Sequence, residues 1–133
     1  MIVDTSAVMA VIEGEDGSAD VEHALAGAST ASMSTATAVE LTSVLMRYGR
    51  VEVHREVDRL LDAWGIRLAP LDEAQTRIAQ QAYRDYGRSS GHPARLNLGD
   101  CFSYALATAS GEPLLFVGDD FARTDIPAVL PRR

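Results

Sequence analysis

Two short apolar segments of the sequence run directly into acidic residues. The segment 1–3 (Met-Ile-Val) stops at Asp4, and the segment 114–117 (Leu-Leu-Phe-Val) passes through Gly118 into Asp119 and Asp120. Short apolar runs that end in this way are consistent with buried strands. Their acids would then lie at the carboxyl ends of the strands, the edge of an open α/β sheet where ligands bind. The pattern therefore predicts an α/β fold with an acidic site.

Helical periodicity and turn residues divide the rest of the chain into helices that alternate with short strands. The 133 residues are most simply one domain, 1–133. We expect Thr5 or Ser6 to cap the first helix, Ser34 or Thr35 the third, Asp72 the fifth and Asn97 the sixth. The expected helices are 5–11, 20–26, 35–48, 51–64, 72–86 and 98–109, the further strands are 30–33 and 66–71, and 87–96 is a loop.

Composition and charge limit the possible functions. The net charge of −7 argues against binding of nucleic acid by bulk electrostatics, although it leaves a local basic groove possible. All 12 positive residues are arginines, and Arg84, Arg88, His92 and Arg95 are close in sequence; they either contact phosphate or are merely solvated. No apolar run approaches the roughly 20 residues of a membrane span, and the single cysteine, Cys101, fits a reducing cytoplasm.

Two further acids lie in the expected helices. Glu40 is flanked by small and apolar residues, so it points either into a cleft or to solvent. Asp100 lies three positions after Asn97, where an acid can cap the helix without any other role. Together with Asp4 and Asp119, these oxygens would suit a hard cation such as Mg²⁺ or Mn²⁺, which would relieve the repulsion among them. The joint pattern therefore favours a divalent-metal site.

Four stretches together resemble the PIN-domain ribonucleases, in particular the VapC toxins of bacterial toxin–antitoxin pairs. The stretches are 1–6, 34–40, 96–106 and 114–121, the last followed by 124–126, and they span nearly the whole chain. The resemblance implies a three-layer α/β/α domain with a central parallel sheet. It matches Asp4, Glu40, Asp100 and Asp119 to the four acids of the family and Ser6 to a supporting polar position. Asp119 and Asp120 are adjacent, whereas the family often separates its two terminal acids, so either one could be the fourth acid.

The resemblance further implies a metal-dependent endoribonuclease that hydrolyses RNA. Asp4 and Asp100 would bind Mg²⁺ or Mn²⁺ directly, and Glu40 and Asp119 would complete the site. A VapB-like antitoxin and a homodimer are the implied partners. The alternative is a catalytically inactive PIN-like module that binds RNA or protein. A phospho-receiver is disfavoured because the chain has no lysine, and a haloacid-dehalogenase-type phosphatase because Ser6 stands where it needs a second Asp.

Overall fold

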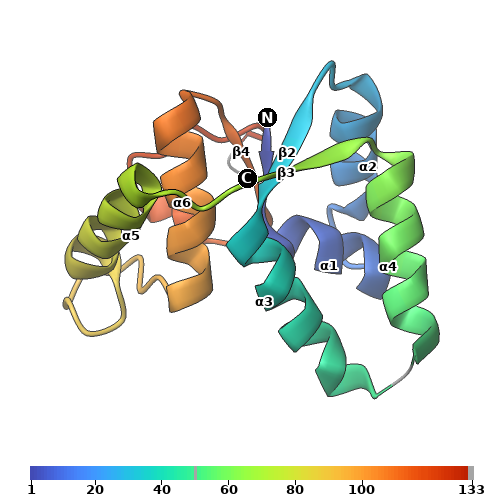
Figure 1. Ribbon diagram of the computed structural model, residues 1–133, viewed down its shortest axis with the longest axis horizontal. Helices are drawn as coiled ribbons and strands as arrows, with labels where there is room; N and C mark the ends of the chain where they lie inside the picture. Colours follow the sequence, from blue (N-terminus) through green and yellow to red (C-terminus); the bar gives the residue numbers. More distant parts are fainter. Residues whose placement is uncertain (50, 132–133) are drawn as a thin grey trace.

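The central sheet has four parallel strands in the spatial order β3-β2-β1-β4. The computed structural model describes residues 1–49 and 51–131 (Figure 1). The strands are β1 (Ile2–Val3), β2 (Ala31–Ser34), β3 (Ile66–Ala69) and β4 (Leu114–Leu115). The helices are α1 (Thr5–Glu13), α2 (Ser18–Gly27), α3 (Thr35–Leu45), α4 (Val51–Ala63), α5 (Glu73–Tyr86) and α6 (Leu98–Ser110), with 3₁₀ turns η1 (Met46–Tyr48) and η2 (Phe121–Arg123).

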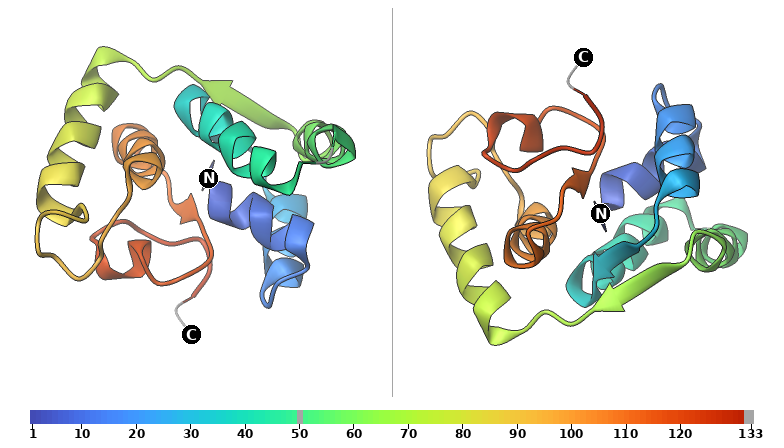
Figure 2. Two further views of the ribbon diagram at one scale, coloured as in Figure 1. Left: turned by 90° about the horizontal axis from the view of Figure 1, so that it is seen from below. Right: turned by 90° about the horizontal axis from the view of Figure 1, so that it is seen from above.

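Two hydrophobic clusters pack on opposite faces of the sheet. In β1, Ile2 belongs to the cluster of α5 and α6, whereas Val3 belongs to the cluster of α1 to α4. Leu114 and Leu115 of β4 divide in the same way, as expected because successive side chains of a strand point to opposite faces. In Figures 1 and 2, α5 and α6 lie on one side of the strands and α1, α2 and α4 on the other. The predicted α/β/α fold is therefore confirmed.

Each expected helix and strand exists, with shifted ends. The N-cap of α1 is Asp4 rather than Thr5 or Ser6, and the expected helix 35–48 is α-helical only to Leu45 before it tightens into η1. The strand predicted at 114–117 ends at Leu115, because the Val117 N–H donates to the Ser6 hydroxyl at 3.1 Å. No helix in the described part of the chain is long and apolar enough to cross a membrane.

The residues that form the site lie at the starts of α1 and α6 and in the middle of α3. Local caps fix all three starts: Asp4 accepts from the Ser6 N–H, Ser34 accepts from the Ala36 N–H, and Asn97 accepts from the Asp100 N–H. β1 leads into α1 and β2 into α3, so both helices begin at the carboxyl edge of the sheet. The edge predicted from the sequence is thus the place where α1, α3 and α6 meet.

Candidate active site

Asp4 lies at the centre of the acidic site and is only 2% exposed. Its backbone N–H donates to the Leu115 carbonyl at 3.0 Å, which anchors it beside β4. The carboxylate Oδ2 accepts from the Ser6 N–H at 3.0 Å, and Oδ1 accepts from the Ser103 hydroxyl at 2.5 Å. Bonds from two different helices therefore fix the orientation of this buried carboxylate.

Glu40 of α3 points toward α6. Its Oε1 accepts from the Thr5 hydroxyl at 2.6 Å, and its Oε2 lies against Gly99, where an added Cβ would stand only 1.0 Å from that oxygen. Burial raises the pKa of Glu40, and the charge of Asp4 raises it further, while the Thr5 hydrogen bond opposes both. The side chain is half-buried between α1 and α6, which argues against the solvated alternative.

Asp100 of α6 caps its own helix and also lies close to the other carboxylates. It forms the capping box predicted as its structural role, since Oδ2 accepts from the Asn97 N–H at 2.9 Å and its own N–H donates to the Asn97 Oδ1 at 2.8 Å. Burial is the main cause that raises its pKa from 3.8 to about 7, with added repulsion from Asp4, Asp120 and Glu40. The cap therefore does not exclude a functional role, because the carboxylate also belongs to a crowded group of negative charges.

The two candidates for the fourth acid lie in the segment after β4. Asp119 and Asp120 are both exposed and follow Gly118, which has the positive φ of 106° that glycine favours. Asp120 is the N-cap residue of η2, and its charge is one of those that raise the pKa of Asp100. Asp119, the residue predicted from the sequence, directly precedes it. The electrostatic contact with Asp100 favours Asp120 for the fourth position.

Sequence analysis missed three residues that contact the acids and a fourth that supports one of them. Thr5 and Gly99 contact Glu40, Ser103 contacts Asp4, and Thr37 lies 3.3 Å from Ser103 through its hydroxyl. Ser103 and Thr37 each lie three positions along a helix from an acid, the spacing that places side chains on one face. That spacing, between Asp100 and Ser103, was the available signal, although a small polar residue in a helix is too common to single out.

The carboxylate oxygens of the site suit a hard divalent cation, although in this conformation they do not surround a single point. Asp4, Glu40, Asp100 and Asp120 offer only oxygen ligands, which Mg²⁺ and Mn²⁺ prefer. Neither salt bridge found in the described part of the chain, Met1 to Glu112 or Glu73 to Arg77, neutralises them. Within residues 1–49 and 51–131, no three His, Cys, Asp or Glu side chains are grouped closely enough to hold an ion in this conformation.

The basic residues in and around the loop 87–96 either stabilise that loop or are exposed. The Nδ1 of His92 accepts from the Ala94 N–H at 3.1 Å, and its ring packs edge-on against Tyr86, so it stabilises the loop. Arg84, Arg88 and Arg95 are exposed.

Burial raises the pKa of the Cys101 thiol to about 12, and the nearby charge of Asp100 adds to the effect. The thiol therefore stays protonated, as expected for a packing residue rather than a nucleophile.

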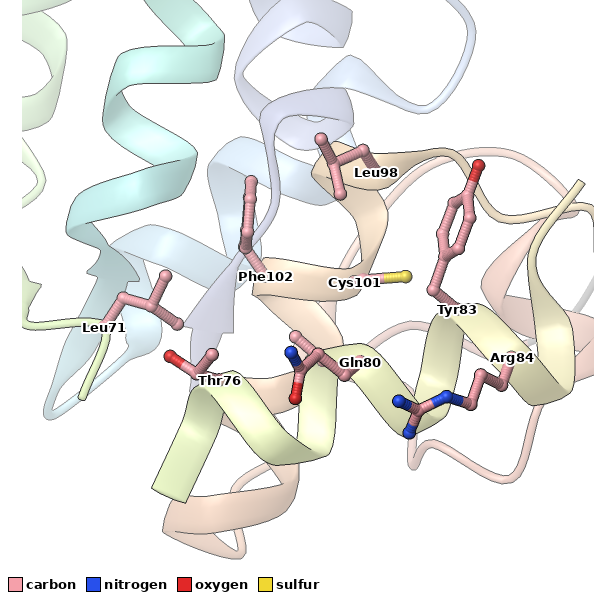
Figure 3. Close-up of a pocket in the computed structure, with 9 residues that line it drawn as sticks. Leu71, Thr76, Gln80, Tyr83, Arg84, Leu98, Cys101 and Phe102 are labelled. Carbon is pink, nitrogen blue, oxygen red and sulfur yellow. The ribbon is translucent and has the colours of Figure 1, made fainter. Parts of the chain in front are cut away.

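The cavity drawn in Figure 3 is separate from the acids. It has a volume of about 320 Å³ and lies between α5 and α6. Leu98, Phe102 and Cys101 of α6 face Tyr83 and other residues of α5 across it, and no acidic residue lines it. This apolar cavity therefore has none of the carboxylates that lie at the sheet edge.

The fold and the site define a class: an α/β protein that gathers carboxylates at the carboxyl edge of a parallel sheet. Comparison with known proteins makes the class specific. The PIN domain matches residues 1–127. The chain is 56% identical over 126 residues to ribonuclease VapC42 of Mycobacterium tuberculosis, covering 95% of this chain and 96% of that protein. The chain therefore belongs to the PIN-domain family, within which its relatives are VapC ribonucleases.

Solved structures support the same fold at low sequence identity. The crystal structure of VapC20 from Mycobacterium tuberculosis, a toxin that cleaves the sarcin–ricin loop, has a TM-score of 0.73 and 18% identity, with 98% of each chain covered. VapBC2 from Rickettsia felis, bound to a DNA fragment from its promoter, has a TM-score of 0.71 and 14% identity, covering 96% of this chain and 94% of that one. At such identities the likeness establishes the fold alone.

Proposed function

We propose that residues 1–133 form a single-domain endoribonuclease that depends on Mg²⁺ or Mn²⁺ and is the toxin of a VapBC-type pair. The observation that carries this proposal is the meeting of Asp4, Glu40 and Asp100, which come from three different helices. Burial raises the pKa of Asp100 to about 7, and the charges of Asp4 and Glu40 are close enough to add to that shift. The likeness to VapC ribonucleases supports RNA as the substrate.

Asp4 and Asp100 would hold the metal directly, and Glu40 with Asp119 or Asp120 would complete its shell. Asp4 can still bind a cation in this arrangement. Each of its carboxylate oxygens accepts one hydrogen bond here, and such an oxygen has room for a second partner. When bound, such a cation lowers the pKa of a water ligand and neutralises charge that develops on the phosphate. The fourth acid, which is exposed, must reorient to join the shell.

The protein's own residues supply orientation and control of protons. Ser6 and Ser103 hold Asp4, and Asn97 holds Asp100, so these two carboxylates enter the reaction in fixed positions. Glu40, with a raised pKa and one oxygen bonded to Thr5, is suited to accept a proton from the attacking water. Hydrolysis by this arrangement needs no side-chain nucleophile, in agreement with the protonated Cys101.

The acidic site also predicts how substrate and inhibitor bind. Without a cation, the carboxylates repel the phosphates of RNA, so metal loading should control RNA binding as well as cleavage. A VapB-like antitoxin could place an arginine among these carboxylates and make charge-assisted hydrogen bonds in place of the metal. The VapBC2 structure from Rickettsia felis supports an antitoxin partner, and we also propose a homodimer. Copurification of the neighbouring-gene product, with loss of cleavage, tests the antitoxin.

Substitution of the two central acids tests the enzymatic function. Asp4→Asn and Asp100→Asn should give folded proteins that no longer cleave a cellular RNA pool in Mg²⁺ or Mn²⁺, as measured by sequencing the new RNA ends. Asp58→Asn, an exposed change on α4, is the matched control and should cleave normally. Chelation should stop cleavage by the unsubstituted protein. Cleavage that persists in either acid variant refutes the assignment, and a wild type that binds RNA without cleaving it would support the inactive module instead.

A further inference from the structure

A fully buried pair of hydroxyl groups lies behind the acids. Thr37 of α3 and Ser103 of α6 are each 0% exposed, and their oxygens are 3.3 Å apart. Ser103 is also 2.5 Å from Oδ1 of Asp4. The three side chains come from three segments separated by 66 and 99 residues in the sequence. Their contact is therefore a product of the tertiary fold.

The hydrogen bonds in this group have only one consistent direction. The Ser103 hydroxyl donates its single proton to Oδ1 of Asp4. Ser103 then has only acceptor capacity left for Thr37, which means that the Thr37 hydroxyl donates to Ser103. The result is a directed chain from Thr37 through Ser103 to Asp4. Because each bond polarises the next, the donor that reaches Asp4 is stronger than an isolated serine.

The two hydroxyls also lie next to the other acids in sequence. Thr37 precedes Glu40 by three residues on α3, and Ser103 follows Asp100 by three residues on α6. Residues three apart share one face of a helix. The contact between Thr37 and Ser103 therefore joins the two helix faces that carry Glu40 and Asp100, while Ser103 also bonds to Asp4.

We infer that Ser103 is a positioning residue of the nuclease, with Thr37 as its support, and that the pair holds Asp4 in the orientation in which it binds the divalent cation. This inference rests on the proposed function. Donors that orient a metal ligand from behind typically contribute 10- to 100-fold to metal affinity or activity. A merely structural hydroxyl pair would affect folding stability and leave the metal affinity of the folded protein unchanged.

Removal of the oxygen atoms tests the inference. We expect Ser103→Ala to weaken Mn²⁺ binding and to lower kcat/KM for RNA by about 10- to 100-fold each. Thr37→Val, which keeps the side-chain shape, should cause a smaller loss in both, whereas Thr37→Ser keeps the donor and should stay within about twofold of the wild type. Once Ser103→Ala has removed the intermediate hydroxyl, adding Thr37→Val should cause little further loss of Mn²⁺ affinity.

The control is Cys101→Ala, which also deletes one heavy atom from a fully buried position of α6. Mn²⁺ affinity is measured by the electron paramagnetic resonance signal of the free ion, and stability by thermal unfolding of the metal-free protein. The inference is overturned if Ser103→Ala loses stability like Cys101→Ala but binds Mn²⁺ as the wild type does. If Ser103→Ala does not fold, Thr37→Val with unchanged Mn²⁺ affinity also overturns it.

The same measurements separate this inference from the proposed function. A wild type that binds Mn²⁺ but does not cleave RNA contradicts the nuclease function, and the positioning role is then judged from Mn²⁺ affinity alone. A wild type that cleaves RNA, together with a fully active Ser103→Ala, contradicts only the positioning role. A wild type that neither binds Mn²⁺ nor cleaves RNA overturns both.

Discussion

Gly99 is the position at which one methyl group should disable the site without unfolding the protein. It lies immediately before Asp100 in α6 and is buried against the carboxylate of Glu40. In Gly99→Ala the new Cβ would stand 1.0 Å from Oε2, whereas real contacts essentially never fall below 3.0 Å, so the carboxylate must move by about 2 Å. The carboxylate is the flexible end of its side chain, and it will therefore move before the backbone of α6 does.

The magnitudes of the effects on stability and on activity differ widely. Alanine in place of glycine stabilises a helix by about 0.5–1 kcal/mol, and loss of the Thr5 to Glu40 hydrogen bond costs about 1 kcal/mol, so the net change in the free energy of unfolding is near zero. Displacement of a reacting group by only 1 Å can lower a rate by about 100-fold. We therefore expect kcat/KM of Gly99→Ala to fall by at least about 100-fold with little change in Tm.

The assay is cleavage of a short RNA that the wild type cuts, with thermal unfolding measured in parallel. Gly27→Ala is the matched control, because Gly27 is also helical and an added Cβ meets nothing within 4 Å. The effect should pass through Glu40, so Gly99→Ala should add little to the loss already caused by Glu40→Gln. Near-normal cleavage by Gly99→Ala, or fully additive losses in the double variant, would refute the reasoning.

Three further predictions follow from the site and its surroundings. The pKa of Asp100 is about 7 in the folded protein and 3.8 ordinarily, so between these pH values the folded, metal-free protein binds more protons than the unfolded chain. Its free energy of unfolding should therefore fall as the pH rises from about 4 to 7. Chemical denaturation should show a weaker dependence of stability on pH for Asp100→Asn. Asp120→Asn should reduce RNA cleavage more than Asp119→Asn, and the reverse order would restore Asp119 as the fourth acid. Tyr104→Phe removes a 2.7 Å hydrogen bond to exposed Asp125 and should cost about 1 kcal/mol in urea unfolding while cleavage continues unchanged; loss of cleavage would contradict this.

Local sequence signals determined the order and type of the secondary structure elements. Asp72 and Asn97 were predicted as helix caps and are caps, because each accepts from an N–H only three residues further along the chain. Apolar runs that end in acids likewise predicted the sheet edge. The errors were of one or a few residues, as at Asp4, which caps α1 itself. An interaction between residues three or four apart can be predicted, because both partners lie in the same short stretch of sequence.

The motifs also determined the family, and they predicted Asp4, Glu40 and Asp100 as the acids of the site. What the sequence could not determine is how each acid is held. Ser103 contacts Asp4 across 99 residues and Thr5 contacts Glu40 across 35, and Gly99 matters only because Glu40 lies against it. Such contacts depend on how the helices pack on the sheet, and no local spacing contains that information. The sequence thus supplied the charged groups, and only the tertiary structure decided their orientation.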